Sequence, residues 1–225
     1  MKRKFGILLL FLVALTSRAD LTNVTVTPNV TVPDASPVGL TSTLTVSGLS
    51  GSATNLTVAL NITGGFNGDL YAYLVSPTGT MVNLLNRVGV GSGNSFGYGN
   101  TGFNVTLDSS FANNIHNYQS GGSGSYSLNG GGQLTGTWKP DGRIIDPRAA
   151  PSAFDAAPTG NTLADLNGSS PNGVWTLFIA DLSGGGQSTL VSWGLTVVTV
   201  PEPQTWALLG GGLTAFWCLT RRQRK

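Results

Sequence analysis

Apolar and polar residues alternate along several short segments of this chain, and this alternation constrains the fold more than any other feature. In one such segment, from Asn55 to Thr63, Leu, Val, Leu and Ile occupy every second position. Successive side chains of a β-strand point to opposite faces, so a period of two predicts a strand with one buried face. The same pattern recurs in residues 69–75 and 80–85, from Trp175 onward and from Trp193 onward.

The rest of residues 20–200 agrees with an all-β fold. This part of the chain contains no glutamate, is rich in Gly, Thr, Ser, Asn and Val, and shows no 3.6-residue apolar period. Turn-forming stretches such as 76–79 separate the strand segments. We therefore predict an antiparallel β-sandwich of about eight strands. Residues 89–104, 121–136 and 143–167 are rich in Gly or Pro, and we expect long loops there, over one end of the sandwich.

The N-terminus has the organisation of a secretory signal peptide. Lys2, Arg3 and Lys4 precede an apolar run over residues 5–15, and small residues then lead to Ala19. A charged start, a short apolar helix and a small-x-small end are the features that signal peptidase recognises. We expect residues 1–19 to be a signal helix that is removed after Ala19, so that the remainder is exported.

The C-terminal 25 residues contain a second targeting signal. A Pro-Glu-Pro tripeptide is followed by an apolar segment over residues 205–220 and by a terminus with four positive charges. Sixteen apolar residues are at the short edge of what spans a bilayer, and the basic end should stay cytoplasmic. We therefore expect a C-terminal transmembrane helix that anchors the chain transiently in the inner membrane. An ordinary membrane anchor is the alternative.

The order of these parts resembles the PEP-CTERM sorting signal of bacterial envelope proteins. This resemblance covers residues 201–225 and implies recognition by an exosortase. The residues that carry it are Pro201, Glu202, Pro203, Arg221 and Arg222.

Charge and cysteine content exclude several classes of function. The whole chain has a formal charge of +2, but residues 20–200 hold four Lys and Arg against nine Asp, a net charge of −5. The exported part therefore has no basic patch for nucleic acid. The single cysteine, Cys218, lies in the C-terminal apolar segment, which leaves residues 20–200 without a disulfide, a thiol nucleophile or a structural zinc site.

The residues for catalysis are also missing. His116 is the only histidine, it sits in a polar stretch where we expect a plain surface or loop residue, and no serine has a G-x-S-x-G context. Glycoside hydrolysis would need paired carboxylates. The aspartates of the loop region stand in no recognisable catalytic context: Asp141, Asp146, Asp155 and Asp165. We therefore predict that the chain is not an enzyme.

Calcium is the ligand that the sequence supports best. Asp69 opens one strand segment after a glycine turn, and Asp181 closes another before a glycine-rich turn. Carboxylates at strand ends, beside loop carbonyls, supply the oxygen ligands that Ca²⁺ prefers. Aspartates at strand ends also serve as turn formers, and that alternative remains open.

Three segments resemble the P domain, or Homo B domain, of kexin- and furin-type proprotein convertases. They are G-D-L-Y-A-Y-L-V-S-P-T-G-T at 68–80, L-T-G-T-W-K-P-D-G at 134–142, and N-G-V-W-T-L-F-I-A-D at 172–181 followed by W-G-L-T at 193–196. The resemblance implies an eight-stranded jelly roll over residues 40–200, after a lead-in at 20–39. In that family the P domain stabilises a subtilisin-like neighbour and is not the catalyst, so a serine endopeptidase label would be inherited.

These observations lead to one expected function and two rivals. We expect an exported structural or adhesive component of the cell envelope or extracellular matrix, with exopolysaccharide or another envelope protein as partner. The first rival is a carbohydrate- or protein-binding module that uses Tyr71 and Tyr73 or the loop at 89–104. The second is an accessory domain that acts on a separate protease.

Overall fold

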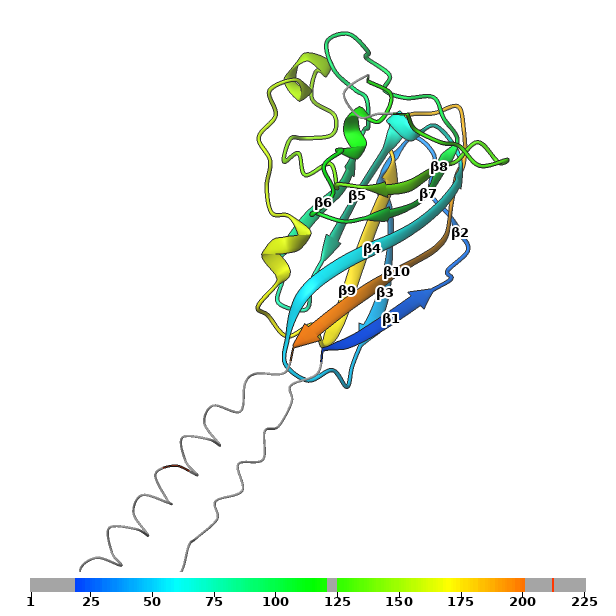
Figure 1. Cartoon of the computed structure of the whole chain (residues 1–225). Helices are drawn as coiled ribbons and strands as arrows, with labels where there is room; N and C mark the ends of the chain where they lie inside the picture. Colours follow the sequence, from blue (N-terminus) through cyan, green and yellow to red (C-terminus); the bar gives the residue numbers. More distant parts are fainter. Residues whose placement is uncertain (1–18, 121–124, 201–211, 213–225) are drawn as a thin grey trace, which may run out of the picture. The chain divides into compact units, whose positions relative to one another are not determined.

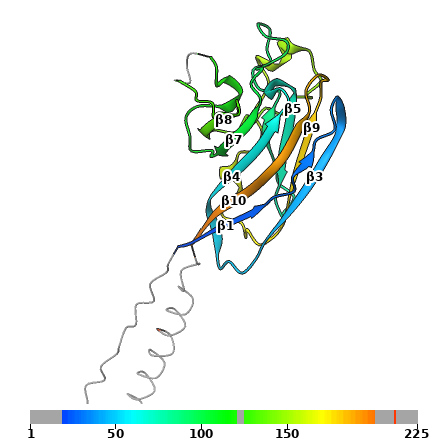
Figure 2. The same cartoon turned by 90° about the vertical axis from the view of Figure 1, so that its right-hand side faces the viewer.

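The computed structural model describes residues 19–120, 125–200 and 212, and Ala19–Val200 forms one compact unit of two stacked β-sheets (Figures 1 and 2). The predicted signal helix lies outside the described residues, as do the sorting residues Pro201, Glu202, Pro203, Arg221 and Arg222. Among the residues that are described, no helix is long and apolar enough to cross a membrane.

The larger sheet has β10 at its centre. Its path is β1 (Asp20–Val26), β10 (Ser188–Val200), β4 (Ser52–Gly64), β7 (Gly102–Leu107) and β8 (Leu134–Trp138), and the short β2 (Val30–Thr31) also pairs with β10. All these pairs are antiparallel except β7–β8, which is parallel. The first strand thus begins at the expected signal-peptide cleavage point and closes one edge of the sheet.

The smaller sheet is wholly antiparallel. Its strand order is β3 (Ser36–Val46), β9 (Gly173–Asp181), β5 (Leu70–Val75) and β6 (Met81–Asn86). The register places Leu70 opposite Asp181, so the start of β5 meets the end of β9 at one end of the sandwich.

The predicted all-β sandwich is confirmed, with differences in detail. The described residues form ten strands rather than eight, and the parallel β7–β8 pair contradicts a purely antiparallel arrangement. β8 begins inside the glycine-rich stretch that we expected to be a loop. Its parallel alignment with β7 needs a long return connection, which the glycine-rich residues supply. The jelly-roll topology stays a prediction.

The core lies between the sheets and consists of the period-two residues. The alternating apolar side chains of β4, β5, β9 and β10 are buried. Trp175 and Trp193 are the two largest side chains in the core, and each ring N–H has an acceptor: the Pro171 carbonyl oxygen at 2.9 Å and the Ser42 Oγ at 2.8 Å. The prediction that these two tryptophans fill the space between the sheets is confirmed.

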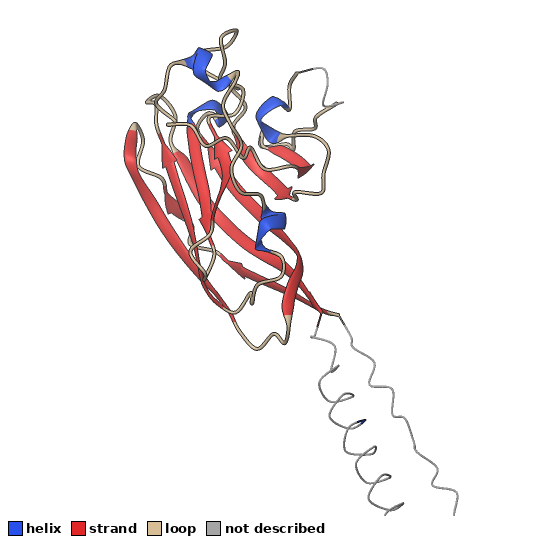
Figure 3. Ribbon diagram, turned by 90° about the vertical axis from the view of Figure 1, so that its left-hand side faces the viewer, coloured by secondary structure: helices blue, strands red, loops and turns tan. Residues whose placement is uncertain are grey.

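Short 3₁₀ turns stand in the loops rather than between the sheets (Figure 3). They are η1 (Asn67–Asp69), η2 (Ile115–Asn117), η3 (Pro151–Phe154) and η4 (Leu163–Leu166). The loop that follows β6 packs tightly on η1, because a Cβ on Gly68 would lie 2.2 Å from the Phe96 carbonyl oxygen. Only glycine allows that approach, so this loop is held in place by backbone contact.

Candidate functional site

Four turns meet at the end of the sandwich away from the Asp20–Thr199 pair, and two buried aspartates lie among them. Asp181 ends β9, and Asp69 is the last residue of η1, directly before β5. The backbone carbonyl of Asp69 accepts the Leu182 N–H at 3.0 Å, which fixes the two segments side by side. The structure thus brings together the two aspartates that the sequence suggested as calcium ligands.

Asp181 is in an unusual state for a carboxylate. Its side chain is fully buried, and Oδ2 accepts the Ser188 Oγ–H at 3.0 Å, while Oδ1 has no hydrogen-bond partner. Burial, which disfavours the charged form, raises the pKa of Asp181 from 3.8 to about 6. The negative charge of Asp69 adds to this rise, and the Ser188 hydroxyl opposes it.

Asp69 is nearly as buried, at 6% exposure, and its pKa is also raised above 3.8. Burial is the largest cause; the Ser183 hydroxyl and the Arg87 guanidinium lower the pKa, and the Asp34 carboxylate raises it. The arginine is itself held at this place, because its Nε donates to the Gly68 carbonyl oxygen at 3.1 Å.

Sequence analysis missed Asp34, Arg87 and the serines of this site. Asp34 lies in the β2–β3 turn, where its Oδ2 accepts the Gly185 N–H at 3.5 Å. The only available signal was the Ser and Gly content of the β9–β10 turn, which is too common in turns to be specific. Contacts between turns more than a hundred residues apart follow from strand order, which the sequence did not predict.

His116 is the centre of a second polar network. It is 3% exposed; Nδ1 lies 2.7 Å from Asp141 Oδ2, and Nε2 lies 3.0 Å from the Val90 carbonyl oxygen. Both neighbours are hydrogen-bond acceptors, so both ring nitrogens donate when the ring is doubly protonated. The other Asp141 oxygen accepts from Arg143 at 3.0 Å. The expectation of a plain surface residue is wrong, because the polar stretch around His116 folds inward onto a buried aspartate.

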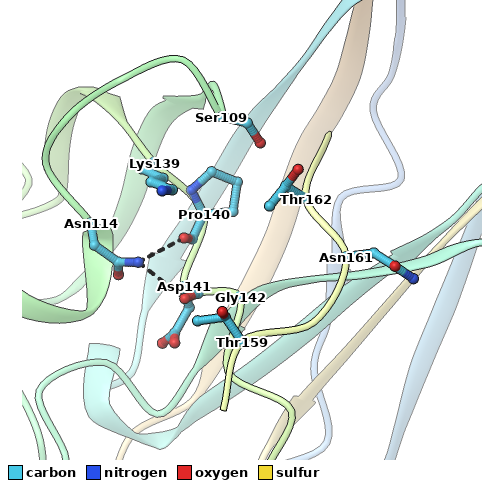
Figure 4. A pocket seen from close by; sticks show the side chains of 9 residues that line it. All are labelled: Ser109, Asn114, Lys139, Pro140, Asp141, Gly142, Thr159, Asn161 and Thr162. Carbon is cyan, nitrogen blue, oxygen red and sulfur yellow. Dashed lines mark hydrogen bonds between the residues drawn. The ribbon is translucent and has the colours of Figure 1, made fainter. Parts of the chain in front are cut away.

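A small cavity adjoins this network (Figure 4). It has a volume of about 80 Å³ and is lined by the 139–142 segment and by side chains that include Ser109, Asn114 and Thr162. The Asn114 amide donates to the carbonyl oxygens of Pro140 and Asp141, at 3.0 Å each (Figure 4). Sites for small-molecule ligands are typically several hundred Å³. This cavity is therefore not a substrate pocket of that kind.

The four loop aspartates considered for hydrolysis have separate structural tasks. Asp141 bonds His116 and Arg143, Asp146 accepts the Arg148 N–H at 2.9 Å, Asp155 accepts the Ser92 N–H at 3.1 Å, and Asp165 caps η4 through Thr162. Hydrogen bonds lower the pKa of both Asp155 and Asp165. Over the described ranges, no three His, Cys, Asp or Glu side chains form a group that could hold a metal ion.

Tyr71 and Tyr73 lie with Phe178 on the outer face of the smaller sheet. The rings of Tyr73 and Phe178 are stacked at 4.8 Å between centroids with 17° between their planes, and Tyr71 packs against both at a tilt. Stacking turns ring faces toward each other instead of toward solvent. The cluster therefore suits cover of the sheet better than a flat platform for sugar rings.

Comparison with known proteins identifies one segment of the sandwich. Residues 53–139 match the family model of the proprotein convertase P-domain. The matched segment contains Asp69, His116 and the strands from β4 to β8. The P-domain is a non-catalytic accessory domain, which agrees with the expectation that this chain is not a catalyst.

Individual relatives are larger proteins. Leupeptin-inactivating enzyme 1 of Streptomyces exfoliatus is 38% identical over 92 residues, which is 40% of this chain and 20% of that enzyme. The chain thus spans about a fifth of the length of this curated relative.

Two crystal structures of an Aeromonas sobria serine protease are also similar, one of them in complex with a chaperone. Their TM-scores are 0.42 for the protease and 0.40 for the complex, at 14% and 16% identity. The matches cover 83% and 84% of this chain, and 28% of the protease chain in each case. Similarity at this level carries no argument about function.

Proposed function

We propose that this chain is an exported, non-catalytic P-domain-like module that acts by contact at the cell envelope, in a structural or adhesive role. The observation that supports it best is the state of His116, the only histidine of the chain. Both of its ring nitrogens face acceptors within the fold, so the ring has no free lone pair to take a proton from a serine.

The direct test of the non-catalytic part is a hydrolysis assay on the purified chain. Casein and dibasic peptides should be cleaved no faster by the wild type than by His116→Ala. Cleavage by the wild type that His116→Ala abolishes would refute the proposal.

Delivery to the envelope rests on the two terminal signals, with signal peptidase and an exosortase as the processing partners. The mature protein should begin directly after Ala19 and end near the Pro-Glu-Pro tripeptide, as measured by intact mass of envelope or secreted material. Glu202→Ala should trap an anchored form, whereas the neighbouring Gln204→Ala should be processed normally. Recovery of wild-type protein with the terminal basic residues attached would leave an ordinary membrane anchor.

A second candidate function is support of a separate serine endopeptidase. The family match favours it, because the P-domain is an accessory domain. The test is the half-life at raised temperature of a subtilisin-like protease from the same organism that has no P domain of its own. Addition of this chain at equimolar concentration should lengthen that half-life if it acts in trans, and equal amounts of albumin should not. An unchanged half-life would leave the structural or adhesive role.

A further inference from the structure

The buried carboxylate of Asp181 is only half satisfied within the fold. Ser188 bonds Oδ2, Oδ1 has no partner, and the Ser183 N–H that lowers the pKa of this group lies outside hydrogen-bond geometry. Most buried polar atoms in proteins have a partner, and an ionised carboxylate that lacks one carries a desolvation cost of several kcal/mol. Either a proton or a cation can remove that cost.

The surroundings favour a cation. Asp69 brings a second buried carboxylate to the same place, and its charge acts directly on Asp181. Arg87 acts on Asp69, but it is not among the groups that influence Asp181. The negative charge at Asp181 is thus not balanced by the one arginine nearby, and Asp34 adds further negative charge from the β2–β3 turn.

The donor set identifies the class of cation. The available groups are two buried carboxylates, the hydroxyls of Ser183 and Ser188 and the carbonyls of the surrounding turns, all of them oxygen. Hard divalent cations prefer oxygen, and Ca²⁺ accepts irregular geometry and neutral oxygens, whereas Mg²⁺ needs a near-ideal octahedron. Only two carboxylates converge closely, so neutral oxygens must complete the shell.

We propose that Asp69 and Asp181 bind one Ca²⁺ ion, with Ser183, Ser188 and backbone carbonyls completing its oxygen shell and Asp34 contributing negative charge. The ion joins the end of η1, the end of β9 and the β9–β10 turn. This site is independent of the envelope role and of the accessory role, because it concerns stability of the sandwich itself.

The test is thermal unfolding of the full chain in non-ionic detergent at pH 8, after treatment with EDTA. Calcium in hundredfold excess over its Kd should raise the melting temperature by about 5–10 °C in a saturable way. Magnesium at equal ionic strength should raise it much less. Asp181→Asn should abolish the calcium response, and Asp20→Asn, which removes an exposed carboxylate, should leave it intact.

A second variant guards against misfolding of the first. Asp69→Asn removes the other carboxylate, and it too should weaken the calcium response. No response of the wild type at pH 8 would mean that Asp181 is only protonated or hydrated, and would refute the site. Equal responses to calcium and magnesium, or a full response of both Asp→Asn variants, would show general charge screening and would refute it as well.

Discussion

Asp181 should make the stability of the cation-free protein depend on pH in a direction opposite to ordinary acid denaturation. Its pKa is raised by burial from 3.8 to about 6 in the folded state. Between these values the folded state holds a proton that the unfolded state has lost, so the free energy of unfolding falls as pH rises through this window. A difference of about two pH units corresponds to roughly 3 kcal/mol, fully present below pH 4 and lost above pH 6.

The comparison with Asp181→Asn isolates this effect, because the amide cannot titrate and the opposing contributions of other aspartates cancel in the difference. In EDTA, the melting temperature of the variant relative to wild type should increase by roughly 6–12 °C from pH 4 to pH 7. Tryptophan fluorescence is a suitable reporter, because both core tryptophans lie between the sheets. Calcium at pH 7 should remove most of the variant's advantage.

Parallel curves for wild type and variant across pH 4–7 would refute the reasoning. They would mean that Asp181 ionises near 3.8 in the folded state, and that burial and the charge of Asp69 are compensated by groups not recognised above. The advantage growing toward low pH would show the opposite sign and would be equally decisive.

Three further variants test the packing. Trp175→Ala should lower the free energy of unfolding by about 3–5 kcal/mol in urea titrations, whereas Val174→Ala, on the solvent face of the same strand and 54% exposed, should change it by less than about 0.5 kcal/mol. His116→Gln should cost about 1–3 kcal/mol by the same measurement, because buried acceptors lose a donor; an unchanged midpoint would mean that the network is not formed. Gly39→Ala should lower the melting temperature more than Gly79→Ala, since both have positive φ but only at Gly39 would the Cβ meet a backbone oxygen, at 2.4 Å.

The strands were predictable where one face of the sheet is buried. Leu56 to Ile62 and the residues from Trp175 and Trp193 onward alternate in sequence because one face meets the core and the other meets solvent. β8 escaped prediction because its short, glycine-containing segment shows little alternation. The parallel pairing of β8 with β7 depends on contacts distant in sequence, which a periodic pattern does not encode.

The candidate site was half predictable for the same reason. Asp69 and Asp181 stood out because each lies at the end of a recognisable strand segment. Asp34 and Arg87 join them only through the order of strands in the folded sheets. His116 was misjudged because neighbouring residues in the sequence are polar, although its partners, Asp141 and the Val90 carbonyl, lie 25 and 26 residues away.

The pairing of the first strand with the last has a mechanical consequence. Asp20 is opposite Thr199 in the β1–β10 ladder, so the two ends of the sandwich leave it side by side. A tensile force applied through both ends would act across this ladder, and its hydrogen bonds would break one after another instead of sharing the force. Because β1 is an edge strand that pairs with β10 alone, such a pull would peel off one strand before it reached the core. The sandwich is thus compliant when stretched between its ends, while its opposite end, with the paired aspartates, would bear little of that force.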